Sequence, residues 1–513
     1  MLLGGCSDDA ADPAAAASNP TEPRARTPSV VVHPVPGDPT RVRVHHADAL
    51  IGLDLSDARA LDIAVSENDR IGLPGQGDAA TVCDSLDLLR LAQRTPKLEE
   101  LRLSGCPSAI HAGLAAFGPT LRRLELVELT LDGVTIGGIG QLRQLESLTL
   151  VQVAAGTDPM RPLRKLPLQK IVLRNLAKDS ELSHMLDLWP KSLKHVVFEG
   201  QWAGHEAMLT LAKADAVEEL ELRGTRIGNF SLNQIKGLEH LRSVVLDGGT
   251  FNDNSPLYFR ELPMVRFVCN CSRVGDGGLR SLRHSEGLVH VELRETSITG
   301  AGLEALAKLD DLQTLVLLDR DIGSEGFNAL ANNESLRELQ LSGPVSNPKL
   351  TGIGALTALQ VLRLRLPDID DRSTEALSKL TGLRVLDLSN TKVSDEGLAN
   401  LGKLTELRDL RLGRTRITKH GLAHLAKLTH LETLHLDHTD AVDEGVAALA
   451  GMPALKELRL DGTLVTDAVI DTLLTFENLE RVSLANTVVT RGGVARLETL
   501  PKLAAIDIDD IRN

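Results

Sequence analysis

Aromatic side chains are scarce in this sequence. Phe, Trp and Tyr make up 2% of its 513 residues, whereas 42% of the residues are hydrophobic. The core must therefore consist mainly of Leu, Val, Ile and Ala, which suits many small and similar layers. The length would allow several domains, but it is only a soft prior on their number.

Basic side chains are also in the minority. The chain has 56 Lys and Arg against 70 Asp and Glu, so its formal net charge is −14. Nucleic-acid binding relies on a basic face and on aromatic rings that stack on bases, and we therefore expect no nucleic-acid partner. A transmembrane helix is not predicted, because the sequence has no apolar run of about 18 residues or more.

The sequence contains few groups that could carry chemistry. Its five cysteines stand at positions 6, 83, 106, 269 and 271, too scattered for a disulfide framework or for a zinc site with paired short spacings. It has no metal-binding H-x-x-x-H motif with a catalytic glutamate, no G-x-S-x-G and no phosphate-binding G-x-x-x-x-G-K-S/T. We predict no catalytic residue, no cofactor and no metal, and hence no enzyme.

A repeat is what the sequence has in abundance. From Leu98 onward the frame L-x-x-L-x-L recurs at intervals of 23 to 25 residues. The units begin at positions 98, 121, 145, 168, 193, 217, 241, 264, 288, 312, 336, 359, 383, 407, 431, 455, 479 and 503. Five consecutive units between Leu383 and Lys502 have 24 residues each, and the first reads LRVLDLSNTKVSDEGLANLGKLTE. A fixed period in this range is typical of a solenoid.

The unit that begins at Leu383 shows how each repeat is expected to fold. Ser394 fits a helix N-cap, with Asp395 and Glu396 in the first helical turn. Three leucines are expected to point inward from a short strand, and three more, spaced by three residues, form the inner stripe of a short helix: Leu383, Leu386 and Leu388, then Leu398, Leu401 and Leu404.

A threonine recurs at the corner between strand and helix. Its hydroxyl is expected to bond to the backbone of the turn, which is a structural role. The threonines at this position are Thr225, Thr296, Thr391, Thr415, Thr439, Thr463 and Thr487. Other units have irregular corners such as GTDPMRP, FNDNSPLYF and GPVSNPK, which are either drift in tolerant loops or binding loops.

This pattern resembles the leucine-rich-repeat family. The tail T-x-I-T-D-x-G-L-x-x-L is most similar to ribonuclease-inhibitor-like repeats of about 24 residues. The resemblance implies an α/β solenoid of about 18 repeats over residues 98–513, with a curved parallel sheet on the concave side and short helices on the convex side. It also implies a scaffold that binds a protein partner.

The N-terminal part differs from the repeats. Leu3-Gly4-Gly5-Cys6 resembles the bacterial lipobox, which implies a lipid on Cys6, although the charged and apolar regions of a full signal peptide are missing. Residues 7–40 are rich in Ala, Pro, Asp, Ser and Thr and are predicted to be a disordered linker. Residues 41–97 are predicted to form an irregular N-terminal cap. Two locations stay open, a lipid anchor in the bacterial cell envelope and a cytoplasmic adaptor without lipid.

The residues between the leucines of the strands form the candidate partner-binding surface. Val172, Val197, Val245, Val268 and Val316 predict an apolar band. A charged band should follow at the strand centres and beside them, formed by Arg363, Asp387, Arg411, His435 and Arg459 with Arg414 and His438. One interpretation is a solvated face whose opposite charges pair with each other. The other is a two-part protein-binding surface.

The remaining cysteines are assigned structural roles. Cys269 takes an inward position of unit 264 and is expected to be a small buried hydrophobe, with Cys271 near the concave edge. Cys83 and Cys106 flank the first repeat, and the resemblance to secreted relatives leaves open that they form a disulfide.

Overall fold

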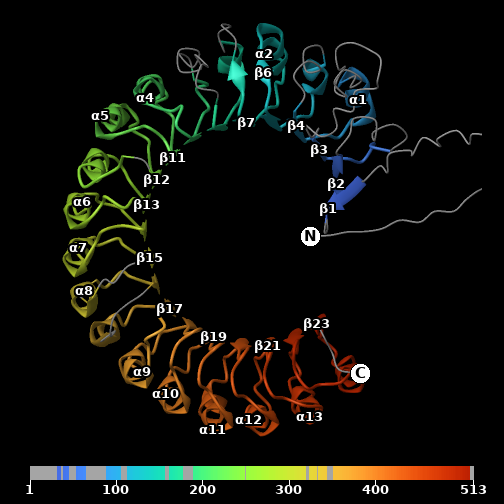
Figure 1. Cartoon of the computed structure of the whole chain (residues 1–513), viewed down its shortest axis with the longest axis vertical. Coiled ribbons are helices and arrows are strands. Elements are labelled where there is room, and N and C mark those ends of the chain that lie inside the picture. Colours follow the sequence, from blue (N-terminus) through green and yellow to red (C-terminus); the bar gives the residue numbers. More distant parts are fainter. Residues whose placement is uncertain are drawn as a thin grey trace, which may run out of the picture.

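The computed structural model describes residues 32–35, 38–44, 54–64, 88–105, 113–155, 161–176, 189–248, 250–318, 323–331, 333–343 and 350–508. These residues form a curved solenoid, in which strands line the inner side of an open arc and helices lie on its outer side (Figure 1). The predicted α/β architecture is confirmed. Cys6, Cys83 and Cys106 lie outside the described residues, as does most of the predicted linker.

Nearly every repeat contributes one short strand. The strands are β1 (Val32–Val35), β2 (Asp38–Val44), β3 (Ala60–Ala64), β4 (Glu100–Ser104), β5 (Arg123–Val127), β6 (Thr130–Leu131), β7 (Ser147–Val151), β8 (Ala154–Ala155), β9 (Lys170–Arg174), β10 (His195–Glu199), β11 (Glu219–Arg223), β12 (Ser243–Asp247), β13 (Arg266–Asn270), β14 (His290–Arg294), β15 (Thr314–Leu318), β16 (Glu338–Ser342), β17 (Val361–Arg365), β18 (Val385–Asp387), β19 (Asp409–Arg411), β20 (Thr433–His435), β21 (Glu457–Arg459), β22 (Arg481–Ser483) and β23 (Ala505–Asp507).

The strands join in one sheet of 21 strands. Strand β1 pairs with β2 antiparallel, and β2 pairs with β3 parallel. From β3 to β23 each main strand pairs in parallel with the strand of the next repeat, without a crossover. Strands β6 and β8 form a separate pair. Because β1 and the start of β2 precede Arg41, the predicted boundary of the cap falls inside a strand.

The connections between strands contain short helices. The α-helices are α1 (Leu88–Arg94), α2 (Gly133–Ile139), α4 (His205–Leu211), α5 (Asn229–Leu232), α6 (Asp276–Leu282), α7 (Gly300–Leu306), α8 (Gly323–Leu330), α9 (Asp371–Leu377), α10 (Asp395–Leu401), α11 (Lys419–Leu422), α12 (Asp443–Ala447), α13 (Val469–Leu473) and α14 (Arg491–Leu497). The 3-10 helices are η4 (Leu114–Phe117), η5 (Arg161–Lys165), η6 (Asn233–Gly237), η7 (Ser255–Phe259), η8 (Leu350–Ala355) and η9 (Ala423–Lys427).

The core lies between the sheet and the helices. Leu386 and Leu388 on the strand side and Leu398 and Leu401 on the helix side are all 0% exposed. Neither element could bury its apolar side alone, so each repeat depends on its neighbours. The inward positions predicted for this unit are confirmed.

The backbone hydrogen bond predicted for the corner threonines is confirmed for five of them as donors, whereas the Thr225 hydroxyl accepts from the Ile227 N–H. Thr391, Thr415 and Thr439 are buried, and each hydroxyl donates a hydrogen bond of 2.6 to 2.7 Å to the carbonyl oxygen three residues earlier. Thr463 and Thr487 do the same. These side chains satisfy backbone carbonyls that the turn would otherwise leave without a donor.

The helix N-cap predicted at Ser394 works differently in the structure. Its backbone is extended, as at an N-cap, but its side chain caps no N–H of its own helix. Instead the Ser394 hydroxyl and main-chain N–H both donate to the Asp371 carboxylate of the preceding repeat, at 2.6 and 2.8 Å. The two roles do not exclude each other, because the Thr418 hydroxyl donates to Asp395 and also accepts from the His420 N–H of its own helix at 3.3 Å.

We call this two-bond contact between neighbouring repeats the clasp. Each clasp joins an aspartate at the start of one helix to a Ser or Thr one repeat later. The pairs are Asp276 with Thr299, Asp371 with Ser394, Asp395 with Thr418, Asp443 with Thr466 and Asp467 with Thr490. The T-D pair of the repeat therefore holds neighbouring repeats together.

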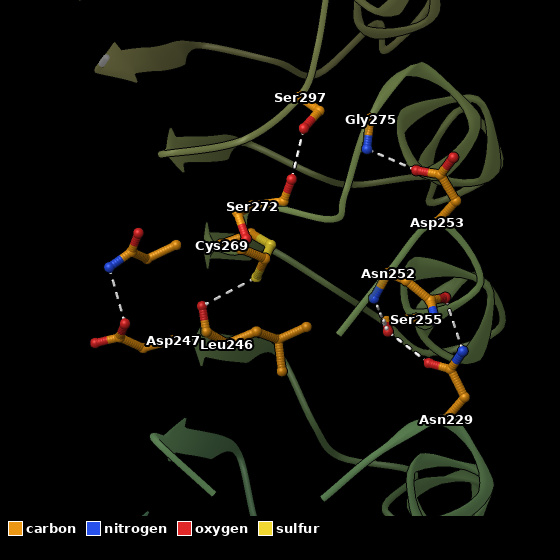
Figure 2. Close-up of a disulfide and its surroundings, with 12 residues drawn as sticks. Asn229, Leu246, Asp247, Asn252, Asp253, Ser255, Cys269, Ser272, Gly275 and Ser297 are labelled. Atoms are coloured by element: carbon orange, nitrogen blue, oxygen red, sulfur yellow. Dashed lines mark hydrogen bonds between the residues drawn. A yellow bond between two sulfur atoms is a disulfide. The ribbon is translucent and has the colours of Figure 1, made fainter. Parts of the chain in front are cut away.

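Cys269 in β13 and Cys271, the first residue after β13, are close together in the structure. Cys269 and Cys271 form a disulfide, and they are 0% and 1% exposed (Figure 2). The burial predicted for Cys269 is confirmed, but the placement of Cys271 near the concave edge is wrong. Cys271 Sγ lies 3.4 Å from the carbonyl oxygen of Leu246, inside the core. In most other repeats the residue at this position has a positive φ and points outward, whereas Cys271 does not.

Candidate functional site

The concave face is built from alternate residues of the strands. In β11, Leu220 and Leu222 point into the core, whereas Glu219, Glu221 and Arg223 face the concave side. Because the strands pair in register, the third residues of successive strands stand side by side in one line. We call this line the middle row.

The middle row contains five of the predicted partner-binding residues. In register from β16 to β22 it consists of Gln340, Arg363, Asp387, Arg411, His435, Arg459 and Ser483. The structure thus brings Arg363, Asp387, Arg411, His435 and Arg459 together on adjacent strands, as the repeat frame predicts.

Most of these charges have partners on the same face. Arg363 bonds to Glu338, and Arg411 pairs with Asp409 at 2.9 Å. The carboxylate of Glu457 accepts from Arg481 at 2.8 Å and from His435 at 3.1 Å, and Arg459 lies 3.5 Å away. Burial by itself raises the pKa of Glu457, but Arg481 and His435 outweigh it and hold the pKa below its usual value. In the unbound chain, the charges of this band therefore pair largely with each other.

Asp387 is the most deeply buried charge on this face, with 1% of its surface exposed. Burial by itself raises the pKa of a carboxyl group. The hydrogen bond from the Ser389 N–H at 3.0 Å and the Arg365 guanidinium at 3.3 Å act in the other direction and prevail, so that the pKa of Asp387 is lowered. The Asp387 carboxylate is therefore a fixed negative charge beside the exposed Arg365 side chain.

Arg414 and His438 lie beside the face, not on it. Both have positive φ angles, 57° and 55°, and both are exposed. Their side chains make no hydrogen bond or ion pair within the described part of the chain. They belong to a line of residues at the ends of the strands, which we call the rim row.

The conformation of the rim row was not predicted from the sequence. Its members share a positive φ and stand two residues after the last core residue of each strand: Gly105, Glu128, Gln152, Asn175, Gly200, Gly224, Gly248, Glu295, Gly343, Asn390, Arg414, His438, Gly462 and Asn486. The sequence does carry a signal for this row, because Gly and Asn recur at its positions and are the residues that adopt a positive φ most readily.

The predicted apolar band does not form an apolar surface. Val172 and Val197 are 4% exposed, Val245 and Val268 are 6% exposed, and Val316 is 9% exposed. Longer neighbours cover these short side chains, and Glu221 and Glu292 interrupt them in the middle row. The valines form a floor between charged side chains.

Glu221 is the centre of a charged cluster in this region. It accepts from His195 Nε2 at 2.9 Å and from Arg223 at 2.7 Å. The hydrogen bond from His195 is the main cause that lowers the pKa of Glu221 to about 2, with Arg223 adding to it and burial opposing it. The carboxylate is therefore ionised over the whole physiological range.

Two hollows lie on the concave face. The first measures about 330 Å³ and lies over β3, β4, β5 and β7, with Asp62, Arg102, Arg123 and Glu125 among its lining residues. The second measures about 770 Å³ and lies over β9, β10, β11 and β12. We call the second one the four-strand hollow. Within the described residues there is no cluster of three or more metal-ligating side chains, and no helix is long and apolar enough to cross a membrane.

Comparison with known proteins agrees with this geometry. Residues 371–510 match a family profile described as a leucine-rich repeat region. A search of curated protein sequences gave no match. A solved TLR13–ssRNA13 complex is similar to the chain with a TM-score of 0.60 and 15% identity, covering 94% of this chain and 75% of the other.

Two further solved structures are similar. The mouse RP105/MD-1 complex has a TM-score of 0.53 and 16% identity, with 80% of this chain and 76% of the other covered. A leucine-rich-repeat protein from Leptospira interrogans has a TM-score of 0.43 and 16% identity, with 75% and 95% covered. The repeat, the parallel sheet and the outer helices define a solenoid. Residues 371–510 form a leucine-rich-repeat region, and the described chain has the leucine-rich-repeat solenoid fold.

Proposed function

We propose that this chain is a non-enzymatic scaffold that binds a protein partner on its concave face. One observation carries the proposal: the inward positions repeat, whereas the outward positions vary. A buried apolar residue stands at the position of Leu386 and Leu410 in the main strands from β3 to β22, while the middle row changes from Val to Glu, Gln, Arg, Asp, His and Ser. Repetition inside builds the scaffold, and variation outside creates a surface of specific shape and charge.

The charge of this surface supports a protein as the partner. Solved structures of similar fold include the RP105/MD-1 complex and the TLR13–ssRNA13 complex, so the fold by itself does not choose between protein and RNA. Here the net charge is −14, and middle-row arginines such as Arg363 and Arg411 already pair with carboxylates of the same face. A phosphate backbone needs a basic face with free cations.

Crosslinking in the native cell, followed by mass spectrometry, tests this proposal. Crosslinks to a protein partner should map to residues of the strands, and reversing two middle-row charges, Arg411→Glu with Arg459→Glu, should weaken capture of that partner about tenfold. The matched control is Arg280→Glu with Lys236→Glu, which makes the same charge change on the helix side. Equal capture by both variants would contradict the proposal.

We further propose that a lipid on Cys6 anchors the chain in a bacterial cell envelope, with residues 7–40 as a tether. The support is the Leu3-Gly4-Gly5-Cys6 sequence and the composition that follows it. The test is expression from the native gene with the codons upstream of Met1, followed by labelling with a fatty acid. Label that disappears in Cys6→Ala supports the anchor. An unlabelled soluble product favours the alternative, a cytoplasmic adaptor.

A further inference from the structure

The four-strand hollow lies on the concave face where β9 to β12 run side by side. We propose that it binds an extended segment of a protein partner that carries one carboxylate, and that Lys170 pairs with this carboxylate. The inference rests on the proposed function, because it names the chemistry of the partner at one place on the same face.

The shape of the hollow suits a segment of a larger protein. Every lining residue belongs to a strand or to the two residues that follow it, and none comes from a helix. A ligand would therefore be covered from one side only, whereas sites for free small molecules enclose most of their ligand. Strands about 4.8 Å apart place β12 roughly 14 Å from β9, the length of about four extended residues.

The floor and walls of the hollow define the chemistry of the segment. Val172 and Val197 form the floor, but each is only 4% exposed, so the charged walls set the chemistry of the hollow. The walls carry opposite charges that neutralise each other, since Arg174 pairs with Glu199 at 2.9 Å and Arg223 pairs with Asp247 at 3.4 Å. A segment of low net charge fits these walls.

Lys170 is the exception among the charges that line the hollow. No carboxylate of the described residues lies within ion-pair distance of its ammonium group, although it is half-buried. A partner carboxylate would supply the missing counter-charge.

The rim beside the hollow is low enough for a chain to pass over it. Gly224 and Gly248 occupy the rim row, with φ angles of 57° and 67°. A Cβ atom at either glycine would meet nothing within 4 Å, so the space above them is open. In other repeats the same position carries a projecting side chain, such as Asn390 or Arg414.

These features allow matched variants. Gly224→Asn with Gly248→Asn fills the rim with a residue that this chain already uses there, at Asn175 and Asn486, so the fold should be kept. Gly451→Asn is the control, because Gly451 also has a positive φ and open space around it but lies on the helix side. Lys170→Glu removes the proposed counter-charge, and Lys236→Glu on η6 is its control.

The experiment uses the full chain and a display library of random peptides as the probe. Selected peptides are labelled, and their affinities are measured by fluorescence anisotropy. We expect selection of peptides that contain Asp or Glu, and binding about tenfold weaker in Lys170→Glu and in the Gly224/Gly248 double variant. Both controls should bind like the parent chain.

Three outcomes would overturn the inference: no enrichment, peptides without an acidic residue, or equal binding by all variants. Failure of the inference about the four-strand hollow can be distinguished from failure of the proposed function. If the native partner is lost on reversal of Arg411 and Arg459 but kept by the hollow variants, the proposed function stands and the inference is wrong. If capture survives both sets of changes, both are wrong.

Discussion

The Thr418 hydroxyl donates a hydrogen bond of 2.6 Å to Asp395 Oδ2, and the Thr418 N–H donates to Oδ1 of the same carboxylate at 2.8 Å. The two residues belong to neighbouring repeats, 23 positions apart. This clasp recurs with the same geometry in four other places. It is interrupted where Lys419 takes the position of the aspartate, and there the next helix has Val442 at its N-cap.

Removing a clasp should destabilise one boundary between repeats. Asp395→Ala leaves two donors of Thr418 without their acceptor, and we expect a loss of about 1 to 3 kcal/mol in the free energy of unfolding. Urea unfolding measures the loss in the free energy of unfolding, and faster hydrogen exchange at residues 418–421 would show that the loss is local to this boundary. Glu396→Ala is the control, because Glu396 is exposed in the same helical turn. A similar loss in both variants would show that the clasp contributes little.

Gly421 should resist replacement by any larger residue. A Cβ atom at this position would lie 2.3 Å from Asp395 Oδ1, closer than atoms can approach. Gly421→Ala must therefore push the carboxylate away from Thr418, and we expect a cost of about 1 to 3 kcal/mol. Combining it with Asp395→Ala should restore part of the loss, which urea unfolding of the double variant measures. Fully additive losses would contradict this explanation.

The hydroxyl of Thr415 can be removed without changing its shape. Thr415→Val deletes the 2.6 Å hydrogen bond to the carbonyl oxygen of Leu412, at a site that is 7% exposed. We expect a decrease of about 1 kcal/mol in the free energy of unfolding. Thr415→Ser keeps the donor and should lose less. If the serine variant is the less stable of the two, packing of the methyl group matters more than the hydrogen bond.

Stability should depend on pH through Glu221. Its pKa is about 2 in the folded chain against 4.5 ordinarily, so the folded state favours the ionised form. The resulting stabilisation is complete above about pH 4.5 and is lost as the pH falls towards 2. Solvent screening limits it to the order of 1 kcal/mol. Urea midpoints of the parent chain and Glu221→Gln should therefore differ at pH 7 and converge at low pH. A difference that stays constant would disprove the linkage.

The buried disulfide between Cys269 and Cys271 should protect both cysteines from alkylation in the folded chain. Because the two residues are 0% and 1% exposed, alkylation after reduction should require unfolding of this part of the chain. Mass spectrometry should find both cysteines unlabelled in urea without reductant, and labelled only when urea and reductant are combined. Labelling in native buffer without reductant would show that the pair is open and accessible.

The sequence was sufficient for those features that depend on one residue type in a fixed frame. Leu386, Leu398 and Thr391 could be placed because burial and local hydrogen bonding follow directly from their spacing. The register of Arg363, Asp387 and Arg411 followed from the same frame.

Features that depend on a neighbouring repeat or on covering side chains were not predicted. The spacing within one unit shows Ser394 next to its own helix, and only the stacked structure reveals that Ser394 donates to the carboxylate of Asp371 in the preceding repeat. Likewise, the exposure of Val197 depends on longer side chains around it. Cys271 could not be placed because its inward direction depends on a backbone angle that differs from the rest of the rim row.

The clasps have a mechanical consequence. Each one spans a single boundary, so a force that pulls the ends of the arc apart is transmitted through many similar joints in series. A small rotation at every joint adds up to a large change in the opening of the arc, while the packing inside each layer is hardly disturbed. The boundary next to Lys419 lacks the carboxylate, so it should be the most compliant of the repeat boundaries between residues 371 and 490. Partners of different width could then fit the same inner surface through bending concentrated at that point.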